Sequence, residues 1–222
     1  MAATMAQRIQ DLIGFDYSSN SINTENEALE VAFAEVIDSL SEEVLLKYAG
    51  APVVLQGGTS SMNIKGKKIL RVLRYDATPI ARICEKLDID EYLSMIVDTN
   101  SVYYPTKYSP VYTENPTSGT PKLEVFPAIT GSADAAESAK VYFVSYLTGD
   151  IDGNSEFTGI PNEVEHAVAL RASLIIMQTM ISDTIQDDED DEMLAMLTSQ
   201  MGSLQQMYQV EMVRLSGEKG EQ

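Results

Sequence analysis

The stretch "GIPNEVEHAVALRASLIIMQTMISDTIQ" (159–186), which runs directly into "DDEDDEMLAMLTSQMGSLQQMYQVEMVRL" (187–215), decides the fold. Its Gly-Ile-Pro start ends a β-rich middle section, and Pro161 suits the first turn of a helix. Apolar residues then occur on nearly all sides of the helical cylinder, which is typical of a helix buried at the centre of a domain. The sequence therefore predicts a central helix near 161–186.

A second long helix is predicted near 191–215. Its apolar residues recur at alternating steps of three and four, with Glu211 interrupting the series, and they are Leu194, Leu197, Met201, Leu204, Tyr208 and Leu215. This spacing is typical of a helix that packs lengthwise on another helix. We therefore expect residues 161–186 and 191–215 to form a packed helical pair, with an acidic corner between them.

A third helix is predicted near 24–48. Thr24 and Glu27 match a capping box, and apolar residues follow at helical spacing up to Leu40, after which Ser41 can introduce a kink. Residues 1–23 show only weak patterning and are expected to form an N-terminal arm. The last residues, 216–222, are expected to form a flexible tail.

The middle of the chain, about 51–147, changes to a pattern of strands and turns. Runs rich in β-branched and aromatic residues are bounded by Gly and Pro, and they are "APVVLQ" (51–56), "KKILRVLRYD" (67–76), "TPKLEVFPAI" (120–129) and "AKVYFVSYLT" (139–148). The prolines of "SVYYPTKYSPVYTE" (101–114) favour edge strands. The segment "IARICEKLDIDEYLSMI" (80–96) is predicted to form a short helix, and "QGGTSS" (56–61) a hairpin turn. The predicted fold class is α+β, with one domain over 24–215: a helical bundle interrupted by an antiparallel β-rich insertion.

Composition excludes several classes of protein. The 222 residues carry 34 acids and 15 bases, a formal charge of −19, which disfavours binding in a DNA groove because such binding needs clustered Lys and Arg. Cys84 is the single cysteine, so no disulfide forms within the chain. The short apolar runs predict no membrane span and no signal peptide. We expect the chain to be made in the cytoplasm.

Two acidic segments are candidate metal sites. The run Asp187–Glu192 is better explained as a solvated turn that caps the following helix, because consecutive acids do not all converge on one ion. "DIDGNSE" (150–156) places oxygens at alternate positions but lacks the spacing and flanking helices of a calcium loop. We expect no metal site and no cofactor. The alternative is a divalent-metal-dependent enzyme that uses Asp150, Asp152 and residues 187–192.

No catalytic constellation is visible in the sequence. His166 is the only histidine, no nucleophile-elbow sequence occurs, and Cys84 lacks recognisable catalytic neighbours. "QGGTSS" lacks the Gly-Lys-Ser/Thr of a phosphate-binding loop. The sequence therefore favours a protein that is not an enzyme.

The candidate contact residues are tyrosines, which suit interfaces between subunits, and residues of the apolar series of 191–215, one of them a methionine, which suits adaptable contacts. The positions expected to contact another subunit or partner are Tyr103, Tyr104, Tyr108, Tyr112, Met201, Leu204 and Tyr208.

The order of these segments resembles the head-to-tail adaptor, or connector, proteins in the neck of tailed bacteriophages, including the gatekeepers of short-tailed phages. The resemblance covers about 24–215 and is carried by "NEALEVAFAEVIDSLSEEVLLKYA", "KKILRVLRYD", "NSVYYPTKYSPVYTENPTSGTPKLEVFPAI", "AKVYFVSYLT" and "GIPNEVEHAVALRASLIIMQTM". The strand "VYFVSY" followed by a polar loop and a helix opened by Ile-Pro is its most specific part. The acidic run and final helix (187–215) are less typical of the family.

The resemblance implies a structural virion protein without chemistry. Its subunits are expected to form a ring of twelve at the head-tail interface, with the portal protein and a tail or further neck protein as partners. Packaged DNA would pass through without specific binding, and no membrane is involved. Acids expected to face the channel are Asp187, Asp188, Glu189, Asp190 and Asp191. Alternatives are a tail terminator or stopper ring and, with less support, a DNA mimic.

Overall fold

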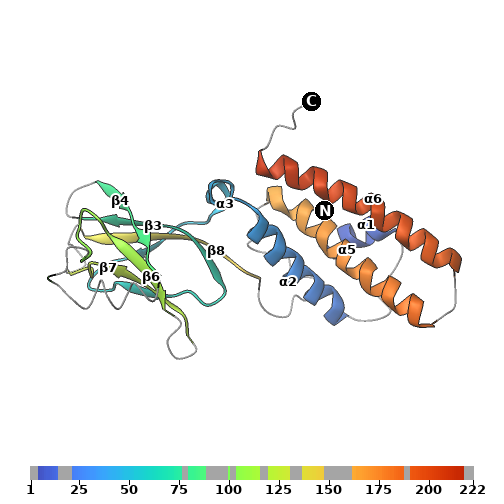
Figure 1. Ribbon diagram of the computed structural model, residues 1–222, viewed down its shortest axis with the longest axis horizontal. Helices are drawn as coiled ribbons and strands as arrows, with labels where there is room; N and C mark the ends of the chain where they lie inside the picture. The colour runs from blue at the N-terminus through green and yellow to red at the C-terminus, as the bar shows by residue number, and fades with distance from the viewer. Residues whose placement is uncertain are drawn as a thin grey trace. The chain divides into compact units, whose positions relative to one another are not determined.

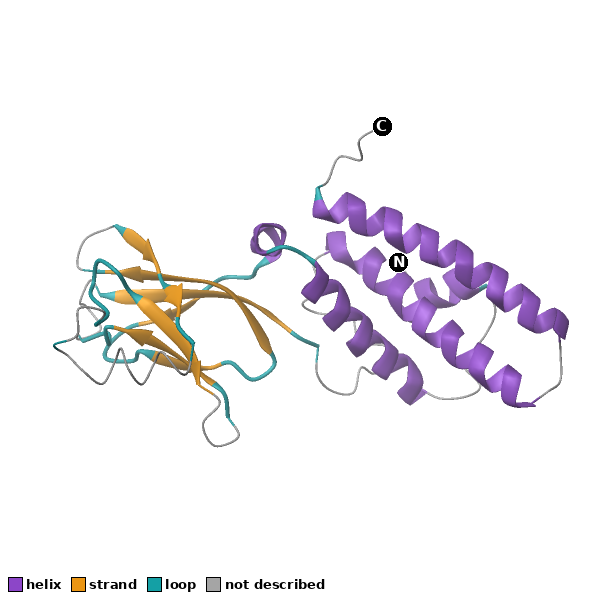
Figure 2. Ribbon diagram, in the orientation of Figure 1, coloured by secondary structure: helices purple, strands orange, loops and turns teal. Residues whose placement is uncertain are grey.

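The computed structural model describes residues 5–14, 22–76, 80–88, 100, 104–115, 120–130, 137–147, 162–187 and 191–217. It contains both helices and sheets, which confirms the α+β class (Figures 1 and 2). The chain divides into two compact units. The helical unit comprises Met1–Val44 and Tyr146–Gln222, and the β unit comprises Leu45–Ser145.

Helix α5 (Asn162–Asp187) is the central helix of the helical unit. It packs against α1 (Met5–Ile13), α2 (Ile22–Ser39) and α6 (Asp191–Ser216), as Figure 1 shows. Its apolar residues face all three neighbours, which explains why they surround the cylinder. The largest fully buried side chains of the unit include Phe33, Ile37, Leu170, Met177 and Leu197. The predicted helices near 161–186 and 191–215 correspond to α5 and α6.

The N-terminal arm predicted over residues 1–23 is wrong for Met5–Ile13, which form α1. Met5, Ile9 and Ile13 are spaced four apart, so they lie on one side of the helix, and all three are buried. Gly14 ends α1 with a φ of 81°, and its N–H donates to the carbonyl of Gln10 at 2.8 Å. The Gln200 amide of α6 donates to the carbonyls of Ile13 at 2.6 Å and Leu12 at 3.2 Å. A glutamine of α6 thus satisfies carbonyls that the end of α1 leaves open.

The helix predicted near 24–48 is two helices. Helix α2 begins at Ile22, so the backbone of Thr24 lies inside its first turn and not at the N-cap position. It ends at Ser39, whose hydroxyl donates to the carbonyl of Val36 at 2.7 Å. Helix α3 (Glu42–Tyr48) then begins with two acids in its first turn, where the helix dipole favours negative charge.

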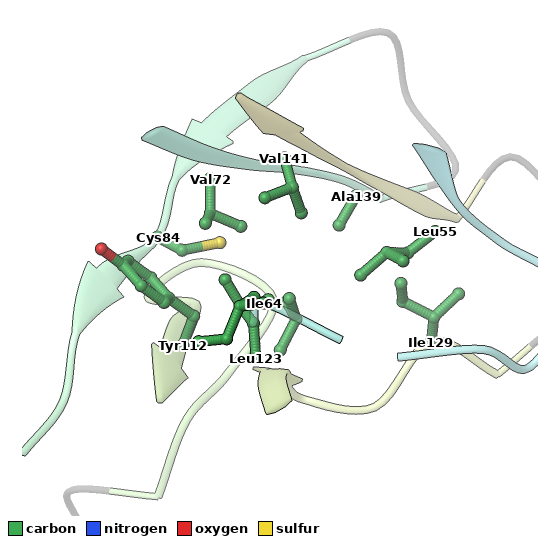
Figure 3. Close-up of a cluster of buried hydrophobic side chains, with 10 residues drawn as sticks. Leu55, Ile64, Val72, Cys84, Tyr112, Leu123, Ile129, Ala139 and Val141 are labelled. Atoms are coloured by element: carbon green, nitrogen blue, oxygen red, sulfur yellow. The ribbon is translucent and has the colours of Figure 1, made fainter. Parts of the chain in front are cut away.

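The β unit contains two four-stranded sheets. The first has the order β1 (Val53–Leu55), β8 (Ser138–Ser145), β3 (Lys67–Tyr75), β4 (Ala81–Ile83). The second has the order β2 (Ser61–Asn63), β7 (Lys122–Phe126), β6 (Val111–Asn115), β5 (Glu85–Lys86). Side chains from both sheets meet in one core, where Val72, Val141 and Leu123 lie among the buried residues (Figure 3).

Four predictions for the β unit are corrected. Residues 56–61 do not join a hairpin, because β1 and β2 belong to different sheets; Gly57 and Gly58, with φ of 64° and 84°, turn the chain from one sheet to the other. Residues 80–88 form β4 and β5 and no helix. The sheets are antiparallel except for the parallel pair β5–β6, and β6 lies inside its sheet instead of at an edge.

Candidate interaction surfaces

Charge is distributed very unevenly between the two units. Of the 34 acids and 15 bases, 10 acids and 11 bases lie in residues 45–145, so the β unit has a formal charge of +1. The remaining 24 acids and 4 bases give the helical unit a formal charge of −20. The acidity of the whole chain is therefore a property of the helical unit alone.

Helix α6 contains a long stretch without charge. The 18 residues Met193–Val210 include no Asp, Glu, Lys, Arg or His. Leu197 and Leu204 are buried, but much of the stretch is exposed, and Val210 is 71% exposed. The exposed large apolar residues of α6 are Met193, Met196, Met207, Val210 and Val213. A solvent-facing helix side normally carries charged residues. This uncharged stretch, on a unit of charge −20, is therefore typical of a surface that another molecule covers.

A hollow of about 180 Å³ lies between α5 and α6. It is lined by Arg171, Leu174, Gln178, Met201, Gln205, Tyr208 and Gln209. Arg171 forms a salt bridge with Glu35 of α2, and this hydrogen bond raises the pKa of Arg171 above its usual value. Burial raises the pKa of Tyr208, which is hydrogen-bonded to Ser39. Met201 and Tyr208, both predicted from the sequence as contact residues, thus lie together at one surface.

The first sheet of the β unit is basic. None of its four strands contains Asp or Glu, whereas six bases lie on them: Lys67, Lys68, Arg71, Arg74, Arg82 and Lys140. Of these, Arg74 is buried, with one nitrogen donating to the carbonyl of Pro127 and another 3.7 Å from Glu137. The other five are at least partly accessible to solvent.

The register defines the outer face of this sheet, on the side away from the core. Val72 and Val141 are paired and face the core, so the neighbouring pair, Leu73 and Lys140, faces outward. The outward row across the four strands is Val54, Lys140, Leu73 and Ile83. Val54 is 45% exposed and Ile83 is 66% exposed.

A second set of outward residues extends this row along the strands. Arg71 pairs with Tyr142, and the Lys140 ammonium lies 5.0 Å from the ring centre of Tyr75. We call these residues and the row together the outer sheet face. It combines two bases with aromatic and aliphatic side chains.

Two of the predicted contact residues are corrected. Tyr112 is only 8% exposed because β6 directs its side chain into the sandwich core (Figure 3). Leu204 is 3% exposed because it lies on the packed side of α6. Neither side chain is accessible to a second subunit. Tyr108 is 69% exposed and has Arg82 and Lys107 within 4.9 and 5.1 Å of its ring centre, whereas Tyr104 is partly buried. Tyr103 lies outside the described residues.

The acids predicted to face a channel are not located by the structure. Asp187 is the last residue of α5 and Asp191 the first of α6, but their side chains and residues 188–190 lie outside the described part. The same is true of Asp150 and Asp152. Among the residues that the structure describes, no group of three or more His, Cys, Asp and Glu side chains is placed to hold a metal ion.

His166 and Cys84, the residues considered for catalysis in the sequence, belong to different units and have different settings. His166 is on the exposed side of α5, in the helical unit. Cys84 is buried in the core of the β unit, and burial raises the pKa of its thiol to about 12. A thiol with that pKa is almost wholly protonated at neutral pH and is a poor nucleophile.

Helix α5 also has the length and composition of a membrane span over Val164–Asp183. More than half of this segment is buried in the structure, where α1, α2 and α6 cover it. Packing at the centre of the helical unit accounts for its apolar composition.

No protein-family model matches the chain, and no curated protein sequence matches it. The interaction surfaces are therefore inferred from the residues and structure of this chain alone. The uncharged stretch of α6 is visible in the sequence as a gap in the charges. The outer sheet face is not, because it depends on which strands are paired and in what register.

Proposed function

We propose that the chain is a structural virion protein of the phage neck, forming a homo-oligomeric ring that joins the portal vertex to the tail and lines the DNA channel. In this proposal the helices form a bundle of adaptor type into which the β region is inserted. The observation that carries the proposal is the uncharged, exposed stretch of α6 on a unit of charge −20.

Electrostatics makes this stretch the favourable place for subunits to meet. Copies of charge −19 repel each other, and contacts through acidic surfaces would bring like charges together. The uncharged stretch avoids this, and it is about 27 Å long at 1.5 Å per residue. Full burial of a Met or Val side chain contributes about 1.5–3 kcal/mol. A few such residues in a row would stabilise a contact between subunits substantially.

The charge of the helical unit suits a channel for DNA. Its 24 acids would repel phosphates that come within about 8 Å at physiological ionic strength. Such a wall would let packaged DNA pass without adhering. The acids of 187–191 remain candidates for this wall.

Two measurements test the proposal. The purified chain, alone and with its portal protein, is analysed by native mass spectrometry and electron microscopy, and phage particles are labelled with an antibody against the chain. We expect a closed ring and label at the head-tail junction. A sixfold ring bound to the tail would support a tail terminator or stopper instead. A monomer in solution together with particles that carry no label would refute the proposal.

A further inference from the structure

A ring of identical subunits requires two different surfaces on each copy. Every contact in such a ring is head-to-tail, so a surface of one copy must complement another surface of the next. The separation of charge between the units supplies such a pair. We infer, in a step that depends on the proposed ring, that the outer sheet face of one copy binds the acidic outer side of α2 in the next copy.

The sheet side of this contact combines apolar and basic groups. Val54, Leu73 and Ile83 supply apolar surface, and the two exposed ones would be covered by the neighbour. Lys140 lies between Val54 and Leu73 in the same row, and Arg71 lies two residues along β3.

The helix side has the opposite charge. Helix α2 contains no Lys or Arg, and its solvent side carries Glu27, Val31, Glu35 and Asp38. Val31 is 48% exposed and provides an apolar centre among the acids. Glu35 is held by Arg171, and Asp38 accepts a hydrogen bond from the Tyr146 hydroxyl at 2.7 Å. The Glu35 carboxylate has two oxygens, and Glu27 adds a further exposed carboxylate on the same side of α2.

The two surfaces also agree in size. The row across four strands spans three gaps of about 4.8 Å, or roughly 14 Å. The distance from Glu27 to Asp38 along α2 is about 16 Å at 1.5 Å per residue. A contact of this size is smaller than a standard stable interface. Its charges would therefore determine which surfaces of neighbouring subunits meet and make assembly sensitive to salt. Apolar burial at the uncharged stretch of α6 would add to the free energy of association.

Nucleic acid fits the outer sheet face less well. Affinity for DNA grows with the number of phosphates that bases neutralise, and few bases lie on this side of the sheet: Arg71 and Lys140 of the outer sheet face, with Lys68 further along β3. The neighbouring subunit, in contrast, offers a whole unit of charge −20. DNA is therefore the less favoured partner of the outer sheet face, and the test below distinguishes it from a neighbouring subunit.

The test compares two double variants that change the charge by the same amount. Arg71→Glu/Lys140→Glu reverses the outer sheet face, and the matched control Lys65→Glu/Lys122→Glu reverses two exposed bases elsewhere in the β unit. Sedimentation velocity at 50 and 500 mM NaCl measures assembly, and circular dichroism checks folding. We expect the protein concentration at half assembly to rise about tenfold or more for the first variant at low salt. The control should stay within about twofold of wild type, and 500 mM NaCl should reduce the difference.

Restoration by a second charge reversal makes the test specific. Adding Glu27→Lys to the Arg71→Glu/Lys140→Glu chain should restore part of the assembly, because opposite charges then attract again at that end of α2. If the reversed chain misfolds, Arg71→Gln/Lys140→Gln, which only removes charge, replaces it. Unchanged assembly in folded variants, or failure of the second reversal to restore it, overturns the inference while the ring itself still forms. Loss of retention on double-stranded DNA cellulose in the variant, with assembly unchanged, would assign the face to nucleic acid. A wild-type chain that stays monomeric at every salt concentration would overturn the inference, and together with phage particles that carry no label it would refute the proposed function.

Discussion

Substitution of Val210 by Glu separates the two roles that the uncharged stretch of α6 could have. In the isolated subunit Val210 is 71% exposed, so its side chain contributes little to folding. Glu is also a better helix former than Val. We therefore expect the free energy of unfolding of the subunit to change by less than about 0.5 kcal/mol.

In an assembly that covers α6, the same substitution acts strongly. The contact would lose about 1.5–3 kcal/mol of apolar burial, and a carboxylate would be placed without a partner in an interface between acidic units. A total loss of about 3 kcal/mol or more corresponds to at least roughly a 100-fold weaker association. The large effect on assembly should thus contrast with a small effect on folding.

Mass photometry over a range of protein concentrations measures association, and thermal unfolding of dilute subunits measures folding. Ile185→Glu is a matched control, because it replaces another exposed apolar residue by Glu at 60% exposure but outside α6. We expect this control to assemble like wild type. If Val210→Glu also assembles like wild type, the uncharged stretch is not a subunit contact and the reasoning is wrong.

Three further predictions concern the subunit itself. Leu123→Ala should destabilise the β unit by about 2–5 kcal/mol in urea unfolding, because Leu123 is fully buried in the sandwich core, whereas Lys122→Ala at the exposed neighbouring position should have little effect; equal effects would contradict the assigned core. The pKa of Glu211 is lowered because Arg214 donates a hydrogen bond to its carboxylate, with 2.8 Å between Nε and Oε2. The ionised carboxylate therefore contributes stability above the usual pKa of 4.5, and this contribution is lost as the pH falls through the lowered pKa. As the pH falls below 4.5, the free energy of unfolding of Glu211→Gln should therefore decrease less than that of wild type. The difference should be at most about 1 kcal/mol, because Arg214 is largely exposed. Identical pH profiles would exclude the ion pair as a stabilising contact. The Cys84 thiol, with its pKa raised to about 12, should react with Ellman's reagent at pH 8 at least about 100-fold more slowly in the folded chain than in urea; fast reaction of the native protein would mean that the core opens.

The helical elements follow from sequence pattern alone to a large extent. Apolar residues around the whole cylinder of 161–186 indicate a central helix, and α5 is central because three helices cover it. Strands β3, β7 and β8 are visible as runs of β-branched and aromatic residues between turn signals. Helix α1 could have been predicted, because Met5, Ile9, Leu12 and Ile13 recur at helical spacing, but the segment spans little more than two turns and is easily overlooked.

The errors at contact residues have a common physical cause. Tyr112 is expected at an interface because tyrosine suits interfaces, and Leu204 because it belongs to the apolar series of 191–215, yet the structure buries both within their own unit. A repeat of three and four shows which residues share a side of α6 but not what covers that side. Here α5 covers the side that contains Leu204, and a different side, with Val210, is exposed.

The sequence by itself determined the α+β class, the order of the main helices and strands, and the overall acidity, because each of these depends on composition or on spacing between near neighbours in the chain. Only the tertiary structure decided that the β region forms two sheets, that Val54, Lys140, Leu73 and Ile83 share one row, and that the acidity is concentrated in the helical unit. Sheet membership and register depend on pairing between residues far apart in the chain, such as Val54 with Lys140, and spacing along the sequence carries no direct record of such pairs.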